Sequence, residues 1–235
     1  MRADIMIFSN IHRMAAIDNA ALCAAMWRAH GLDLERVDGC VACSGTPPRF
    51  YPHVVTVDPE IDPQVQMRFI AERMARAPEV FFVKDSYRVL PLESLGFEPL
   101  FDARWIHRAA NLAAGRTRLS WRPVMVAAEL GAWEAAWSGG ADAPPLFLPA
   151  FLARSGITIL AGWADGAIVA GCIVTVTDAV AGLSNVFGDA SEAISAATMT
   201  FSGRDLVGYE NGDALVAALA AGFQTVGDLV VWRRP

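Results

Sequence analysis

The chain has 235 residues and a formal net charge of -6, and its 19 Lys and Arg residues form no run, so we expect no nucleic-acid partner. Hydrophobic residues make up 54% of the sequence, yet no window reaches the ~18 consecutive apolar residues that a membrane-spanning helix needs. The first ten residues, MRADIMIFSN, lack the apolar core and small-residue cleavage site of a secretion signal. We therefore expect a cytoplasmic protein without a membrane partner, with a length that suits two domains or a single larger one.

The apolar pattern of the first part predicts strands that alternate with helices. In chain order the predicted elements are a strand at 5–8, a helix at 17–30, a strand at 52–57, a helix at 64–77 and a strand at 79–83. The residues between 32 and 52 are polar and rich in Gly and Pro, and they predict a loop. The stretch 89–106 then predicts a helix, the pair Gly96-Phe97 and an apolar strand.

A small, basic linker at 109–120 separates this part from a second series of elements. These are an edge strand at 121–126, helices at 130–137 and 146–154, strands at 157–163, 167–177, 180–187 and 205–210, a helix at 212–221 and a strand at 226–232. Asp165-Gly166 predicts a hairpin turn because both residues tolerate positive φ. Strand 167–177 is apolar on both faces, which is typical of a central strand covered on two sides.

The helix at 212–221 has recognisable ends. Asn211 and Asp213 can accept hydrogen bonds from the free amides at its start, and Gly222 can adopt the left-handed conformation that ends it. We expect Leu215, Val216 and Leu219 to lie on one face and to pack on the sheet.

The four cysteines, Cys23, Cys40, Cys43 and Cys172, are too few and too scattered for a disulfide framework. Cys40 and Cys43 have the spacing of a metal or redox site, but no second such pair and no His pair follows them. We therefore expect two ordinary thiols and no metal.

The pattern Asn211-x-x-Ala214, followed by Gly222-Phe223 and an apolar strand, resembles the C-terminal signature of the GNAT superfamily of acyl-CoA-dependent N-acyltransferases. The resemblance implies an α+β fold, a mixed α/β arrangement with a central mixed sheet flanked by helices. It also implies transfer of an acetyl or other acyl group from acetyl-CoA, or another acyl-CoA, to an amine of a small molecule or peptide.

The stretch around Gly96-Phe97 resembles the stretch around Gly222-Phe223. Both carry an Asp six residues after the Gly, at Asp102 and Asp228, and a Trp near the strand end, at Trp105 and Trp232. The two glycines are 222 - 96 = 126 residues apart, about one domain. We interpret the chain as a tandem duplication, with a shortened GNAT-like half at 1–110 and a second half at 120–235.

The resemblance also implies where a cofactor binds. Strand 180–187 stands where the fourth strand of the family lies and parts from the fifth strand, here 205–210. The free backbone groups between them would then pair with the pantetheine arm as another strand would. The cofactor-binding residues that follow are Leu183, Ser184, Asn185, Val186 and Asn211.

The catalytic assignments rest on the end of strand 205–210. Family members often use a Tyr four residues before the Gly as the acid, but this chain has Ala218 there. We therefore take Glu210 as the candidate base, acting directly or through a water, and Tyr209 as a substitute acid. The four dispersed histidines supply no catalytic assignment, although His107, just past the first Trp-bearing strand, could reach a cleft between the halves.

The loop that holds the pyrophosphate in the family, Gln/Arg-x-x-Gly-x-Gly/Ala, is replaced here by residues 188–192. Asp189 and Glu192 form a capping box and bring negative charge to the place of the diphosphate. Residues 58–62 are as acidic at the corresponding place in the first half. Three hypotheses stay open: an acyltransferase with a divergent cofactor loop, a ligand-binding or regulatory module without the chemistry, and a structural protein that forms a homodimer.

Overall fold

The computed structural model describes residues 2–76, 80–178 and 180–235. The chain forms two compact units, one of Met1–Trp105 with Val226–Pro235 and one of Ile106–Thr225. This division differs from the predicted halves 1–110 and 120–235, because Val230 and Trp232 of the last strand belong to the hydrophobic core of the first unit. Packing, rather than chain order, sets the boundary.

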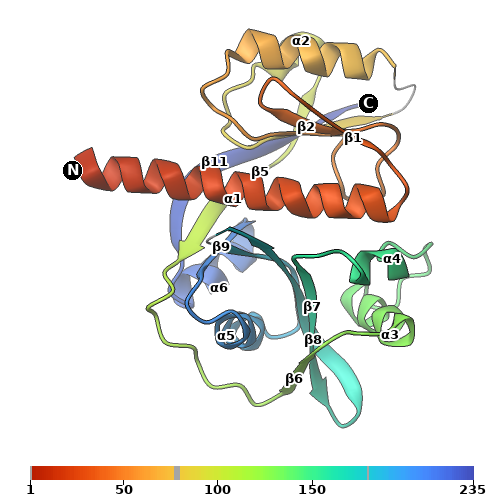
Figure 1. Ribbon diagram of the computed structural model, residues 1–235, viewed down its shortest axis with the longest axis vertical. Coiled ribbons are helices and arrows are strands. Elements are labelled where there is room, and N and C mark those ends of the chain that lie inside the picture. Colours follow the sequence, from red (N-terminus) through yellow and green to blue (C-terminus); the bar gives the residue numbers. More distant parts are fainter. Residues whose placement is uncertain (1, 77–79, 179) are drawn as a thin grey trace. The chain divides into compact units, whose positions relative to one another are not determined.

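The first unit is a sheet between two helices. Its elements are α1 (Arg2–Ala29), β1 (Leu34–Val37), β2 (Cys40–Cys43), β3 (Val54–Thr56), α2 (Pro63–Met74), β4 (Phe81–Asp85), the 3-10 helix η1 (Leu92–Leu95), β5 (Glu98–Arg108) and the end of β11 (Gln224–Arg234). The strand order is β1-β2-β3-β4-β11-β5, with α1 and α2 on opposite faces of the sheet (Figure 1). Met67 and Ile70 of α2 pack against Val54, Val83 and Trp232 of the sheet.

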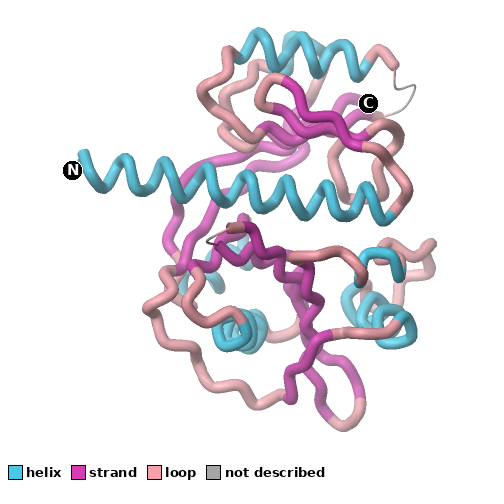
Figure 2. Tube along the Cα trace, viewed as in Figure 1, coloured by secondary structure: helices cyan, strands magenta, loops and turns pink. Residues whose placement is uncertain are grey.

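The second unit is also a sheet covered on both faces. Its remaining elements are β6 (Ser120–Pro123), α3 (Ala127–Trp137), α4 (Pro149–Leu152), β7 (Ile157–Ala164), β8 (Ala167–Thr177), β9 (Val180–Phe187), α5 (Ala190–Thr200), β10 (Asp205–Glu210) and α6 (Gly212–Ala220). The strand order is β10-β9-β8-β7-β6. Figures 1 and 2 show α5 on one face of β7 and β8 and α3 with α4 on the other.

The predicted mixed α/β fold class is confirmed, and so are most elements of the second unit. Strands 180–187 and 205–210 have the predicted bounds. The hairpin turn is also confirmed, because Asp165 and Gly166 have φ of 50° and 79°. The central strand β8 is buried over most of its length, between β7 and β9.

The predicted strand at 5–8 is wrong, because those residues belong to α1. A short apolar run does not distinguish a strand from a helix, and no Gly or Pro interrupts the chain between Arg2 and Ala29. Among the described residues, no helix, this long one included, is apolar enough over a sufficient length to cross a membrane.

The predicted loop between 32 and 52 is also wrong in part, because it contains the hairpin of β1 and β2. Its turn is Asp38-Gly39, with φ of 51° and 73°, the same dipeptide that marks the second-unit hairpin. The expected helices at 89–95 and 146–154 are only η1 and α4. Residues 77 and 79 of two predicted elements lie outside the described residues.

Helix α6 packs only in part as expected. Leu215 packs against the core of the second unit, as predicted. Val216 is 66% exposed and Leu219 42% exposed, and Ala218 is the buried residue of the helix. Asn211 occupies the N-cap position but makes no capping hydrogen bond with its side chain. Gly222 has φ of 91°, so the predicted left-handed end is confirmed.

Each unit contains a pair of parallel strands joined by a helix. These pairs are β3 and β4 with α2, and β9 and β10 with α5. The shared arrangement supports the hypothesis of a duplication, which stays a prediction.

Candidate functional site

Strands β9 and β10 pair only where they begin. The parallel register joins Val180, Ala181 and Gly182 to Asp205, Leu206 and Val207, and the described residues show no further pairs between the two strands. Gly208 follows at the point of separation, where an added Cβ would lie 2.8 Å from the Leu183 carbonyl oxygen. The two strands therefore part as predicted, beyond a close backbone contact that only glycine allows.

A β-bulge lies on β9 just past this point. Gly171 of β8 pairs with Phe187 and Ile173 pairs with Ser184, so β9 has one more residue than β8 over this stretch. Asn185 lies within the bulge and has φ of 51°. A bulge redirects backbone groups out of the regular ladder, and bulges are frequent beside binding sites.

The side chains predicted to bind a cofactor have varied surroundings. Leu183 is buried, and Val186 packs against the same core. The Ser184 hydroxyl donates to the Ile173 carbonyl oxygen at 3.4 Å, and Asn185 Nδ2 donates to Ser184 Oγ at 3.3 Å. The edge of β9 beyond Gly182 therefore offers a ligand mainly its backbone.

The two predicted catalytic residues do not share a face. Successive side chains of a strand point to opposite sides, so Glu210 lies on the face of Leu206 and Tyr209 on the face of Asp205. Burial raises the pKa of Glu210 from 4.5 to about 7. A carboxyl group with this pKa can both take up and release a proton near neutral pH. Asn211, the next residue, is exposed.

The N-terminus of α5 is occupied by a carboxylate of the chain itself. Asp189 Oδ1 accepts hydrogen bonds from Ser191 N at 2.9 Å and Glu192 N at 3.4 Å. A bond from the Ser191 hydroxyl is the main cause that lowers the pKa of Asp189. The amides that would bind a diphosphate therefore already donate hydrogen bonds to a carboxylate of the chain.

Glu192, the other acidic residue of this helix start, does not complete the predicted capping box. Its carboxylate is buried and accepts from Arg118 N at 2.9 Å, Arg118 Nε at 3.1 Å and Leu119 N at 3.4 Å. Burial alone would raise the pKa of Glu192, but these hydrogen bonds outweigh it and lower the pKa. Arg118 also forms an ion pair with Asp189 at 3.1 Å, so one cation ties the linker to both acids.

Two polar residues of β5, His107 and Arg108, make contacts that were not predicted. His107 Nε2 lies 2.9 Å from Asp205 Oδ2, and Asp205 Oδ1 accepts from Ala110 N at 2.8 Å. Arg108, 6% exposed, donates to the carbonyl oxygens of Ala221, Leu112 and Ala113. His107 is therefore part of a structural contact at the start of β10, away from Glu210 at its end. Sequence patterns give no signal for a buried Arg that binds carbonyls.

Cys40 and Cys43 stand at the two ends of β2, and all four cysteines are free and buried. Burial raises the pKa of Cys40 to about 12, so its thiol is a poor nucleophile at neutral pH. The described residues contain no group of three or more His, Cys, Asp or Glu side chains placed to hold a metal ion.

Comparison with known proteins identifies the fold. No protein-family model and no curated protein matches the chain. Among solved structures, the chain is similar to a GCN5-related N-acetyltransferase from Kribbella flavida, with a TM-score of 0.59, 14% identity, and coverage of 94% of this chain and 95% of that one.

Two further structures are similar. One is a functionally unknown conserved protein from Staphylococcus epidermidis, with a TM-score of 0.53, 11% identity and coverage of 83% of each chain. The other is a GCN5-related N-acetyltransferase from Sphaerobacter thermophilus, with a TM-score of 0.51, 16% identity, and coverage of 73% of this chain and 67% of that one. The chain therefore has the GNAT fold that the C-terminal signature implies.

Proposed function

We propose that the second unit is an acyltransferase that moves an acetyl or other acyl group from a coenzyme A thioester to an amine of a small molecule or peptide. The observation that carries the proposal is the parting of β9 and β10 beyond Gly182 and Val207, with Glu210 at the end of β10. The pKa of Glu210, about 7, suits a group that exchanges protons at neutral pH. The shared fold supports the proposal by analogy.

In the proposed reaction, the pantetheine arm lies along the free edge of β9 and pairs with its backbone. The neutral amine nitrogen attacks the thioester carbonyl carbon, and Glu210 takes one proton from this nitrogen as the C–N bond forms. A backbone amide of the bulge at Asn185 stabilises the oxyanion of the tetrahedral intermediate. The C–S bond breaks as the amide forms, and the thiolate leaves with the electron pair.

The proton for the thiolate can come from Glu210 itself, which is protonated after the first step. Tyr209, the predicted acid, projects from the other face of β10, which favours Glu210 for both transfers. Tyr209 as the acid stays a prediction. Asn211 as a cofactor contact also stays a prediction, and its exposure is compatible with one.

The start of α5 sets a limit on the donor. Asp189 already accepts hydrogen bonds from the helix amides, and Glu192 adds a second carboxylate close by. A diphosphate there meets repulsion of order 1 kcal/mol or more for each charge pair at a partly exposed site. We therefore expect the pantetheine arm and the acyl group, rather than the diphosphate, to supply most of the donor affinity.

A second function is favoured by the same contacts. Because Arg118 ties the linker to Asp189 and Glu192, the diphosphate place is closed by the chain itself. A ligand-binding or regulatory module that uses the slot for another extended molecule is compatible with this arrangement. The two functions differ in whether an acyl-CoA binds and reacts.

Titration of the purified chain with acetyl-CoA, CoA and S-acetyl-pantetheine by calorimetry tests the proposal. We expect saturable binding of acetyl-CoA. The affinity for S-acetyl-pantetheine should lie within about tenfold of that for acetyl-CoA, which is a difference in binding free energy of about 1.4 kcal/mol or less. Release of free thiol with a panel of amines then measures turnover. No binding of either thioester at concentrations well above micromolar would transfer our proposal to the ligand-binding module.

A further inference from the structure

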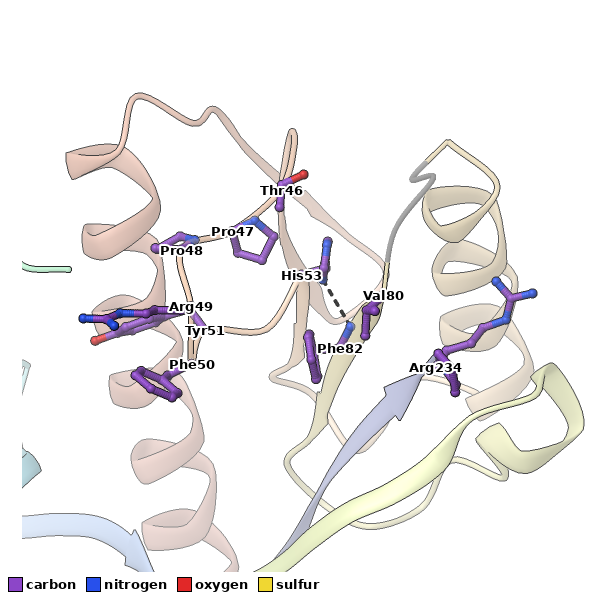
Figure 3. Close-up of a pocket in the computed structure, with 11 residues that line it drawn as sticks. Thr46, Pro47, Pro48, Arg49, Phe50, Tyr51, His53, Val80, Phe82 and Arg234 are labelled. Carbon is purple, nitrogen blue, oxygen red and sulfur yellow. Dashed lines mark hydrogen bonds between the residues drawn. The ribbon is translucent and has the colours of Figure 1, made fainter. Parts of the chain in front are cut away.

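Two cavities lie in the first unit, at one end of β3, β4 and β11, and we call them the joined cavities because Thr46 and His53 belong to the walls of both. The larger has a volume of about 620 Å³, and its apolar lining includes Pro47, Pro48 and Phe82 (Figure 3). Arg49 and Arg234 also line it. The smaller, of about 130 Å³, has Arg73 and Arg76 in its wall. Both chambers therefore contain cations, and the larger one also offers an apolar surface.

His53 stands between the two chambers and is held firmly. It is 5% exposed, and its ring stacks on Phe81 with centroids 4.2 Å apart. Phe82 N donates to His53 Nδ1 at 3.1 Å, so Nδ1 has no proton and the neutral ring carries its proton on Nε2. Figure 3 shows the second ring nitrogen directed away from Phe82, on the side of Thr46.

The Nε2–H group is the donor that the ring can offer to a ligand. Within the described residues, the bond from Phe82 N uses Nδ1 and leaves Nε2 for that role. Burial, with the nearby Arg73 guanidinium, lowers the pKa of His53 to about 4, so the ring is neutral near pH 7. A hydrogen bond from this N–H group to a carboxylate oxygen is charge-assisted and is stronger than a bond between two neutral groups.

The smaller chamber has two arginines in its wall. Arg73 binds Glu35 at 2.8 Å and also donates to the Cys43 carbonyl, which fixes its guanidinium beside the chamber. The Glu35 carboxylate offsets the charge of Arg73, so the charge of Arg76 remains. Because His53 is neutral, the chamber favours a compact anion over a cation.

The rim of the larger chamber is aromatic and strained. Phe50 is 78% exposed and has φ of 68°, a conformation that a bulky side chain rarely adopts. Strained residues cluster at binding sites, where the surrounding structure holds them in place.

We propose that the joined cavities bind a small carboxylic acid with an apolar body. The carboxylate accepts the Nε2–H bond of His53 in the smaller chamber, beside Arg73 and Arg76. The body, an aromatic ring or a branched chain, lies in the larger chamber against Pro47, Pro48 and Tyr51. This site belongs to the first unit, so its occupancy does not depend on acyl transfer in the second.

The first test is a titration of the full chain, labelled at histidine, with phenylacetate and with phenylacetamide as its uncharged counterpart, followed by nuclear magnetic resonance. We expect saturable shifts of the His53 ring signals with phenylacetate and at least about tenfold weaker binding of the amide. Binding also raises the pKa of His53, because a bound carboxylate favours the imidazolium. Inorganic phosphate serves as the anion without an apolar body and is expected to bind more weakly.

Two substitutions at one position separate the ligand contact from the structural one. In His53→Asn, the side-chain oxygen can replace Nδ1 as acceptor for Phe82 N, while the donor at Nε2 is lost. In His53→Gln, the side-chain amide can replace the Nε2 donor, while the bond to Phe82 N is lost. We expect His53→Asn to keep the fold and weaken phenylacetate binding by about tenfold or more, and His53→Gln to be less stable yet retain more of the affinity.

Arg76→Gln is a second variant that leaves His53 unchanged, and it should weaken phenylacetate binding severalfold without unfolding the chain. His30→Gln, in the same unit but outside both cavities, is the matched control and should bind as the original chain does. The proposal fails if phenylacetate gives no saturable shift of the His53 signals, or if both His53→Asn and Arg76→Gln bind it as tightly as the unaltered chain.

Discussion

Replacing Glu210 by Gln should stabilise the chain at alkaline pH while abolishing turnover. The pKa of Glu210 is raised from 4.5 to about 7, so the folded state holds this proton more tightly than the unfolded state. The stabilising contribution is therefore complete below about pH 4.5 and is lost as the pH rises through 7. The full difference between the two pKa values corresponds to about 3 kcal/mol in free energy of unfolding. Because the side chain is partly exposed, solvent screening reduces this contribution to about 1–2 kcal/mol.

Urea unfolding at about pH 4.5 and about pH 8 measures this effect. We expect Glu210→Gln to match the original chain at the lower pH and to exceed its free energy of unfolding by about 1–2 kcal/mol at the higher pH. Asp142→Asn, an exposed carboxylate in the loop before α4, is the control and should change neither value appreciably. Equal stability of Glu210→Gln and the original chain at both pH values would refute the buried-carboxyl reasoning, and unchanged turnover would remove Glu210 from the mechanism.

The other predictions concern contacts around the slot. Asp189→Ala frees the α5 amides, so calorimetry should show acetyl-CoA binding about tenfold more tightly and the affinity for S-acetyl-pantetheine unchanged. The variant should also lose about 1 kcal/mol in free energy of unfolding, because the helix loses its cap. Equal gains in affinity for both thioesters would contradict the diphosphate argument. Gly208→Ala should destabilise the chain by about 1–3 kcal/mol in thermal unfolding, because its Cβ would meet the Leu183 carbonyl at 2.8 Å, whereas Gly131→Ala in helix α3, with nothing within 4 Å, should be neutral or stabilising. Arg108→Met should cost roughly 2–4 kcal/mol in urea unfolding, since three carbonyl oxygens lose their donor, and a loss below about 0.5 kcal/mol would exclude that role.

Local chemistry in the sequence was sufficient for much of the second unit. Asp165-Gly166 specifies its turn because both residues adopt positive φ, and Gly222 ends α6 for the same reason. Asp189 caps α5 through atoms two and three residues away. The same rule, applied to Asp38-Gly39, would also have found the β1–β2 hairpin that the surrounding polar residues concealed.

Other features required the folded chain, because they depend on residues far apart in the sequence. The partner of Glu192 is Arg118, 74 positions away, and no capping rule contains it. The assignment of Val230 and Trp232 to the first core, and the exposure of Val216, follow from which surfaces meet and not from the apolar pattern of either segment.

The sequence by itself therefore determined most elements of the second unit, the turns and caps named above and the signature of the fold, since turns and caps act within a few residues. The tertiary structure alone decided that β9 and β10 part after three pairs, that burial moves the pKa of Glu210 to about 7, and that His53 is buried between two cavities. Desolvation and strand separation are set by what packs around a residue, and a linear pattern does not contain that neighbourhood.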